Sequence, residues 1–187
     1  AVHNGFTYPV ALRSLMRQDP QVIMIGEIRD AETAAVAVQA SLTGHLVIST
    51  IHSGSTAGVF TRMLNMGIEP FLLCSSIIAV LGMRLLPQNC GMCAAPYVPE
   101  IGEDSQLSQE ILDAAEFRKG LGCNHCDFTG YGTRRGIVEM LVPDRGFREA
   151  VMRKEPDHAL YQIAIDAGMK TMWEHGIRRA ICGEARY

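Results

Sequence analysis

Four of the six cysteines form two Cys-x-x-Cys pairs, a spacing typical of residues that bind a metal ion. The pairs are Cys90 with Cys93 and Cys123 with Cys126. A Cys-x-x-Cys turn directs both thiolates the same way, and two such turns complete the tetrahedral sulfur shell that zinc favours. Four thiolates leave no open position for a substrate, so we predict a structural zinc site. A redox pair and a site that no longer binds metal are the alternatives.

An acidic residue follows the first strongly apolar run of the chain. Residues 22–25 are all apolar, and Gly26 and Glu27 come next. Such a run is typical of a fully buried strand in a parallel sheet, and ligands of open α/β sheets bind beyond the carboxyl ends of the strands. Glu27 therefore stands where a carboxylate can meet the terminal phosphate of a nucleotide and its attacking water. The same pattern ends many strands without a catalytic role, so both interpretations stay open.

Two histidines flank a second apolar run, at residues 46–51. His45 precedes this run and His52 follows it, and their spacing matches no metal-binding motif. Either ring can donate a hydrogen bond to a phosphate. We favour a structural role for His45. His52 suits a structural role and a phosphate contact equally, because it follows a strand.

A strand, helix, strand unit is expected to position these side chains. Asp30 can cap a helix over residues 31–42, whose apolar residues recur at the spacing of one buried face, and Gly44 can end it. Parallel strands joined by such a helix have their carboxyl ends at one edge of the sheet. Glu27 and His52 are therefore expected to lie at the same edge.

The pattern along the chain predicts three domains. Residues 1–87 carry the two strands and their helices, residues 88–142 are rich in cysteine, glycine and loop residues, and residues 143–187 have helical patterns. Cys74 and Cys182 lie in apolar helical patterns and are expected in the core rather than as ligands. The other expected helices cover residues 7–16, 55–65, 71–86, 107–117, 145–153, 157–167 and 171–182.

The composition excludes some classes of protein. The 187 residues carry a net charge of -3 and are 48% hydrophobic, which is enough for a core and for one domain with an appendage or two small domains. A mildly acidic chain argues against a protein whose main work is to neutralise nucleic-acid phosphates, and Arg134 with Arg135 is only a small basic patch. We expect no nucleic acid among the partners. The apolar run at residues 71–83 is too short to span a bilayer.

A nucleotide site cannot be completed from this sequence. It has no phosphate loop of the form GxxxxGK followed by Ser or Thr, and none of its three lysines follows a glycine. The chain begins at Ala1, directly in front of core-forming sequence, and we expect it to be part of a longer protein. Paired cysteines without a secretion signal indicate a reducing cytoplasm.

Several segments together resemble the type II secretion and type IV pilus assembly ATPases. Residues 12–20 and 26–30 are similar to the Walker B region of that family, and residues 43–52 are similar to its histidine box. Residues 66–73 and the two cysteine pairs, the second followed by Thr-Gly-Tyr at 129–131, resemble its assembly branch rather than its retraction branch. The resemblance covers nearly the whole chain.

The resemblance implies an α/β fold, with part of a RecA-like P-loop NTPase core, a tetracysteine zinc subdomain and a helical tail. It implies a homohexamer that hydrolyses ATP with Mg²⁺ to power type II secretion or type IV pilus assembly. The implied partners are the inner-membrane platform and cytoplasmic domains of that machinery. The protein would be cytoplasmic and peripheral to the bacterial inner membrane through those partners.

The resemblance also implies roles for single residues. Glu27 would orient or activate a water molecule near Mg²⁺, and His45 and His52 would lie near the phosphates. Phosphoryl transfer needs such positioning and charge stabilisation, with little covalent help. The implied zinc ligands are Cys90, Cys93, Cys123 and Cys126.

This sequence departs from the family pattern at two places. Residues 53–55 are Ser-Gly-Ser, where the family usually has Thr-Asn-Asp. Residues 83–85 are Met-Arg-Leu, where the family has Gln-Arg-Leu. The phosphate loop of the family should precede Ala1, so we expect the fragment alone to be inactive. The alternatives are a zinc-ribbon-like module that binds protein or nucleic acid, and a degenerate motor subunit without hydrolysis.

Overall fold

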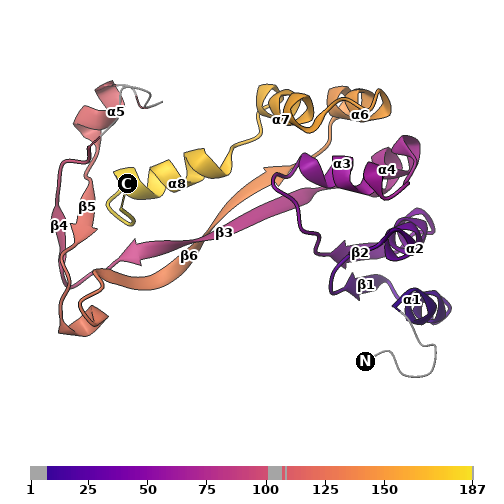
Figure 1. Cartoon of the computed structure of the whole chain (residues 1–187), viewed down its shortest axis with the longest axis horizontal. Helices are drawn as coiled ribbons and strands as arrows, with labels where there is room; N and C mark the ends of the chain where they lie inside the picture. Colours follow the sequence, from indigo (N-terminus) through magenta and orange to yellow (C-terminus); the bar gives the residue numbers. More distant parts are fainter. Residues whose placement is uncertain (1–7, 101–106, 108, 187) are drawn as a thin grey trace. The chain divides into compact units, whose positions relative to one another are not determined.

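The computed structural model is an α/β structure of helices and two-stranded sheets (Figure 1). It describes residues 8–100, 107 and 109–186. The helices are α1 (Tyr8–Met16), α2 (Ala31–Leu42), α3 (Gly58–Asn65), α4 (Pro70–Ser76), α5 (Gln109–Ala114), α6 (Arg145–Met152), α7 (Asp157–Asp166) and α8 (Met172–Ile181), with a short 3-10 helix at Asn124–Cys126. The strands are β1 (Val22–Ile25), β2 (Leu46–Ser49), β3 (Val80–Asn89), β4 (Ala94–Pro96), β5 (Arg118–Gly120) and β6 (Tyr131–Leu141).

The described residues form two compact units, and each unit contains two separate stretches of chain. The first unit comprises residues 8–80 and 140–169, and the second comprises the described residues of 81–139 and 170–186. The three domains expected from the sequence stay a prediction, but the contacts group the last helices differently. Helices α6 and α7 belong to the first unit, whereas α8 belongs to the second.

Strands β1 and β2 pair in parallel, as the strand, helix, strand pattern predicts. Val22 lies opposite Leu46, and Ile25 lies opposite Ser49. Helix α2 makes the connection between them, beside the two strands in Figure 1. The carboxyl ends of both strands therefore meet at one edge of this small sheet.

Helix α2 begins and ends at the residues that the sequence indicates. The Asp30 carboxylate accepts hydrogen bonds from the backbone N–H of Thr33 at 2.8 Å and from its hydroxyl at 3.1 Å. These bonds, the backbone one first, lower the pKa of Asp30. Gly44 follows the helix with a φ of 98°, a left-handed conformation that a side chain would strain. The two caps fix where β2 can begin.

The described residues cover only one face of the β1–β2 sheet. Ile23 and Ile25 are buried, but Val22 and Met24 point to the other face and are exposed, Met24 by 79%. The expectation of a fully buried first strand is therefore wrong for the part of the chain described. Side chains alternate between the faces of a strand, so every second residue of β1 remains uncovered.

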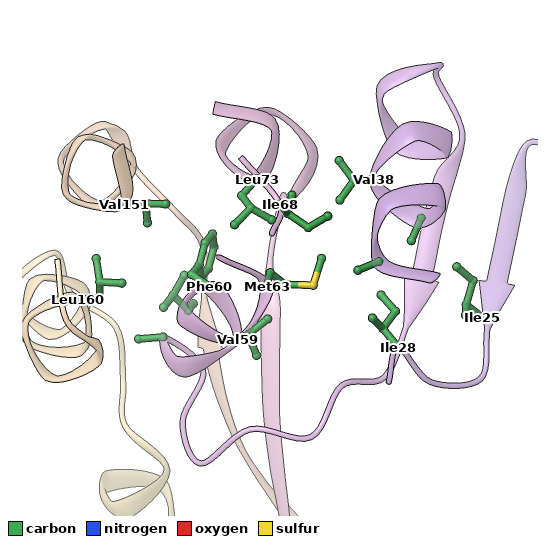
Figure 2. Close-up of a cluster of buried hydrophobic side chains, with 14 of the residues drawn as sticks. Ile25, Ile28, Val38, Val59, Phe60, Met63, Ile68, Leu73, Val151 and Leu160 are labelled. Atoms are coloured by element: carbon green, nitrogen blue, oxygen red, sulfur yellow. The ribbon is translucent and has the colours of Figure 1, made fainter. Parts of the chain in front are cut away.

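The core of the first unit joins residues that are distant in the sequence (Figure 2). Phe60 of α3 and Leu73 of α4 pack in one cluster with Val151 of α6 and Leu160 of α7. The rings of Phe60 and Phe147 meet edge to face, with their centroids 4.9 Å apart. This aromatic contact stabilises the packing of residues 140–169 within the first unit.

The expected helix over residues 71–86 is wrong beyond its first turns. Helix α4 ends at Ser76, and the chain enters β3, which continues through Pro87 to Asn89. Strand β3 pairs with β6, far along the chain. A short apolar run fits a helix and a strand about equally, so the distant partner decides the outcome.

Other expectations of local structure have mixed outcomes. Helices α6, α7 and α8 confirm the three helical patterns near the end of the chain, and α3 and α1 confirm the earlier ones. The pattern at residues 107–117 yields only the shorter α5, and residue 108 lies outside the described part. Cys74 is half-buried, but Cys182 is exposed and not a core residue. Within the described ranges, every helix is too short or too polar to cross a membrane.

We expect Phe60→Ala to lower the free energy of unfolding by about 3–5 kcal/mol, because it removes a fully buried aromatic side chain and leaves a cavity. Denaturant unfolding of the purified chain measures this loss. Phe71→Ala is the matched control, since Phe71 is exposed on the neighbouring helix α4. Equal stability of the two variants would contradict the described core.

Candidate functional site

Glu27 lies immediately beyond β1, with its carboxylate between two cationic or ionisable side chains. Its Oε1 is 3.3 Å from Nε2 of His52, and its Oε2 accepts a hydrogen bond from Nε of Arg29 at 2.5 Å. The Glu27 side chain is only 17% exposed, whereas the His52 side chain is 87% exposed. The structure thus brings Glu27 and His52 to the same edge of the sheet, as predicted from the strand ends.

Two hydrogen bonds extend the pairing of the strands beyond their last residues. The backbone N–H of Ile28 donates to the carbonyl oxygen of Thr50 at 2.9 Å. The hydroxyl of Thr50 donates to the carbonyl oxygen of Gly26 at 2.7 Å. The segments that carry Glu27 and His52 are therefore tied to each other on both sides of Glu27.

His45 is not brought to this edge. It precedes β2 and lies at the opposite end of the sheet, since Leu46 is paired with Val22. Its Nδ1 lies 3.0 Å from the carbonyl oxygen of Ala40 and 3.2 Å from the hydroxyl of Thr43. These local contacts agree with the structural role favoured from the sequence, and the phosphate role implied by the resemblance stays a prediction.

A residue that the sequence could not indicate, Asp157, contacts the loop after His52. The Ser55 hydroxyl donates to Oδ1 of Asp157 at 2.9 Å and accepts from the backbone N–H of Gly58 at 2.9 Å. A Cβ added at Gly58 would lie only 2.6 Å from Oγ of Ser53. The Ser-Gly-Ser departure from the family pattern is thus a packed polar loop, attached to the start of α7.

The four paired cysteines lie together in the second unit, as their spacing predicts. All four Sγ atoms lie within 4.8 Å of one another. The Sγ of Cys123 is 3.9 Å from that of Cys90 and 3.8 Å from that of Cys126, and the Sγ of Cys93 is 3.9 Å from that of Cys126. A tetrahedron of sulfurs at the usual zinc–sulfur distance has edges of about 3.8 Å. The cluster therefore has the donors and the spacing for one metal ion.

The thiols of this cluster differ in how readily they ionise without metal. Burial opposes ionisation of Cys126, but backbone N–H groups of Cys123 and Gly130 and the neighbouring thiols donate to its sulfur and lower its pKa to about 6. Burial raises the pKa of Cys93 to about 11, helped by the neighbouring sulfurs and opposed by the backbone of Gly122. One sulfur is thus a thiolate near neutral pH, which favours a cation at this place.

The small basic patch considered for nucleic acid is partly neutralised. Nη1 of Arg135 lies 3.0 Å from Oε2 of Glu184, which also accepts a hydrogen bond from Arg179 at 2.6 Å. Arg134 is exposed beside this group on β6. Glu184 thus offsets part of the positive charge of Arg135 and Arg179, while Arg134 stays exposed.

Solved structures share the fold of this chain. The ATPase DotB of Legionella pneumophila matches with a TM-score of 0.64 at 18% identity, over 96% of this chain and 40% of that protein. The pilus retraction motor PilT, solved with bound ADP, matches with a TM-score of 0.57 at 20% identity, over 93% of this chain and 44% of that protein. The chain therefore shares its fold with the matched parts of these two structures.

Sequence comparison identifies the family. The family described as "Type II/IV secretion system protein" matches residues 2–186, and the chain belongs to it. The type IV pilus assembly ATPase PilB of Thermus thermophilus is 42% identical over 181 residues, which are 96% of this chain and 20% of that protein. Type II secretion system protein E of Aeromonas hydrophila is 46% identical over 160 residues, which are 86% of this chain and 32% of that protein. The chain thus spans one fifth to one third of these relatives, and the resemblance found in its motifs is confirmed.

We expect the stability of the metal-free chain to fall as the pH is lowered from 9 towards 6. Folding lowers the pKa of Cys126 from 9.0 to about 6, so the thiolate contributes stability that is complete above pH 9 and lost below pH 6. The raised pKa of Cys93 acts in the opposite direction and only above pH 9. Thermal unfolding of the reduced, chelator-treated chain at several pH values measures the slope.

Cys126→Ala should flatten this slope, whereas Cys182→Ala, at an exposed cysteine outside the cluster, should keep it. An unchanged slope in Cys126→Ala would contradict the assignment of the thiolate.

Proposed function

We propose that the chain is part of an ATPase that powers type II secretion or type IV pilus assembly. The observation that carries the proposal is the Glu27 carboxylate, held at the end of a parallel strand 3.3 Å from the His52 ring of the neighbouring strand end. Family membership and relatives named as a pilus assembly ATPase and as a secretion protein E support it. The activity is proposed for the longer protein, because the relatives are three to five times longer than the part matched.

Glu27 is the proposed water-positioning residue. Phosphoryl transfer depends on an oriented nucleophile and on stabilisation of charge. A carboxylate has about four lone-pair sites, so Glu27 can accept a hydrogen bond from the attacking water while it keeps its contacts with Arg29 and His52. The low exposure of Glu27 restricts the directions in which its oxygens can point, which favours one orientation of that water.

The residues of this chain fit ATP and Mg²⁺ in part. The Glu27 carboxylate offers the oxygen ligands that Mg²⁺ prefers, directly or through water. The exposed His52 ring can donate a hydrogen bond to a phosphate oxygen. The sequence has no phosphate loop with its lysine, so the groups that hold the phosphates are proposed to lie elsewhere in the longer protein. The chain alone should bind ATP weakly and should not hydrolyse it.

The second part of the proposal is a structural zinc ion held by Cys90, Cys93, Cys123 and Cys126. It is supported by the sulfur spacing of 3.8–3.9 Å and by a donor set made only of thiols. Zinc bound there would join the two cysteine pairs and would add to the stability of the second unit. With four sulfur ligands it has no free position for catalysis.

The longer protein is proposed to act as a homohexamer in the cytoplasm, peripheral to the inner membrane. Its proposed partners are the inner-membrane platform and the cytoplasmic domains of the secretion or pilus machinery. The family resemblance supports these assignments. The family membership of the chain favours this function over a module that binds nucleic acid.

In the full-length protein, Glu27→Gln should lower ATP turnover by about 10²–10⁴-fold, because the amide cannot accept a proton or polarise the water as the carboxylate does. Nucleotide binding should be retained, since the side chain keeps its size. Steady-state phosphate release and a nucleotide-binding titration measure the two effects.

Glu32→Gln is the matched control, because Glu32 is an exposed carboxylate in the first turn of α2 and forms an ion pair with Arg13 at 3.4 Å. It should turn over ATP at the parental rate. If Glu27→Gln and Glu32→Gln hydrolysed ATP equally fast, the assignment of Glu27 would fail.

Zinc is tested independently of hydrolysis. The reduced chain should contain one zinc per molecule by elemental analysis, and Cys123→Ser should lose it, because oxygen replaces one of four sulfur ligands. Cys182→Ser, which changes an exposed cysteine outside the cluster, should keep the metal. Metal-free protein after purification in zinc-containing medium would refute the site.

A further inference from the structure

Gly130 connects the two cysteine pairs through its own backbone. Its N–H donates to Sγ of Cys126 at 3.3 Å, and its carbonyl oxygen accepts from the backbone N–H of Cys90 at 2.9 Å. One peptide segment thus contacts a proposed ligand of each pair. Gly130 contributes only backbone atoms to both contacts, so the residue type at 130 matters only through the room and the backbone angles it allows.

The backbone at Gly130 leaves no room for a side chain. Its φ is 78°, and a Cβ added there would lie 2.6 Å from the carbonyl oxygen of Gly120. The approach is mutual, because a Cβ added at Gly120 would lie 1.8 Å from the carbonyl oxygen of Gly130. The obstacle on either side is backbone, which cannot move aside as a flexible side chain would.

Backbone pairing connects Gly120, the other residue of this contact, to the first cysteine pair. Gly120 is paired with Ala94 in the antiparallel β4–β5 sheet, and the backbone N–H of Leu121 donates to the carbonyl oxygen of Cys93 at 3.1 Å. A displacement at Gly130 would therefore be passed through β5 to the segment that holds Cys93. The Gly120–Gly130 contact fixes one cysteine pair against the other.

The distances between sulfurs of different pairs are the ones that depend on this contact. The distance from Cys90 to Cys123 and that from Cys93 to Cys126 are both 3.9 Å, close to the value of about 3.8 Å for a tetrahedral zinc site. A Cys-x-x-Cys turn sets the spacing within a pair, but it cannot set the spacing between pairs.

We propose that Gly130 is the positioning residue of the tetracysteine metal site. Its N–H bond to Cys126, its carbonyl bond to Cys90 and its close approach to Gly120 hold the two pairs at the sulfur spacing of zinc. The inference rests on the zinc site proposed above. It goes further by assigning the preorganisation of that site to one residue that is not a ligand.

The test compares Gly130→Ala with Gly132→Ala in the full 187-residue chain. Gly132 lies two residues further along, on β6, and a Cβ there would be 3.9 Å from the nearest atom, an ordinary contact. Zinc affinity is measured by competition with a chromogenic chelator, and release rates are measured with the same reagent. Gly130→Ala should bind zinc about 10–100-fold more weakly than the unsubstituted chain. Gly132→Ala should match the unsubstituted chain.

Gly120→Ala serves as a second variant, because its Cβ meets the same contact from the side of β5. It should weaken zinc binding as Gly130→Ala does. Unchanged affinity in Gly130→Ala would overturn the proposal. Thermal unfolding of the Phe60 core in the same samples separates a local effect from general misfolding, since that core lies in the first unit.

Loss of the Phe60 transition together with zinc binding in Gly130→Ala would also overturn the proposal. Absence of zinc from the unsubstituted chain would refute the zinc site itself and the role of Gly130 with it. If the unsubstituted chain contains zinc and Gly130→Ala binds it with unchanged affinity, only the role of Gly130 is refuted.

Discussion

The register between β1 and β2 is the constraint on which the candidate hydrolytic site depends. Each strand has only four residues, and the bonds from Ile28 to Thr50 and from Thr50 to Gly26 continue the pairing into the loops. Each such bond contributes only about 1 kcal/mol, yet a slip of one residue would turn Ile23 to the opposite face of the sheet. The burial of one face therefore selects the register, and the register brings Glu27 beside His52.

The second unit is stabilised by different physics. Its buried apolar residues are few and mostly small, in contrast to the aromatic and aliphatic cluster around Phe60 in the first unit. Backbone hydrogen bonds to sulfur and the contact between two glycines replace side-chain packing around the cysteines. A metal ion suits such a unit, since small units with weak cores often gain their stability from metal ligands.

The sequence predicted what depends on nearby residues. Asp30 and Gly44 mark the ends of α2, and the apolar runs place Glu27 and His52 after parallel strands. The prediction was wrong where the secondary structure depends on a distant partner. Residues 71–86 are partly strand because β6 pairs with them. The contact of Asp157 with the loop after His52 likewise joins residues 102 positions apart in sequence, which no local pattern records. No local pattern indicates the contact between Gly120 and Gly130 either, because only folding brings these two backbone segments together.

The interleaving of the two units along the chain has a consequence for biosynthesis. A ribosome makes the chain from its amino end, so all four paired cysteines emerge before Phe147 and Leu160, which complete the first core. The second unit also waits for the last residues, because the backbone N–H of Asn89 donates to the carbonyl oxygen of Glu184. During translation the parts of α3 and α4 that pack against Phe147 and Leu160 therefore stay open to solvent until these residues have been made.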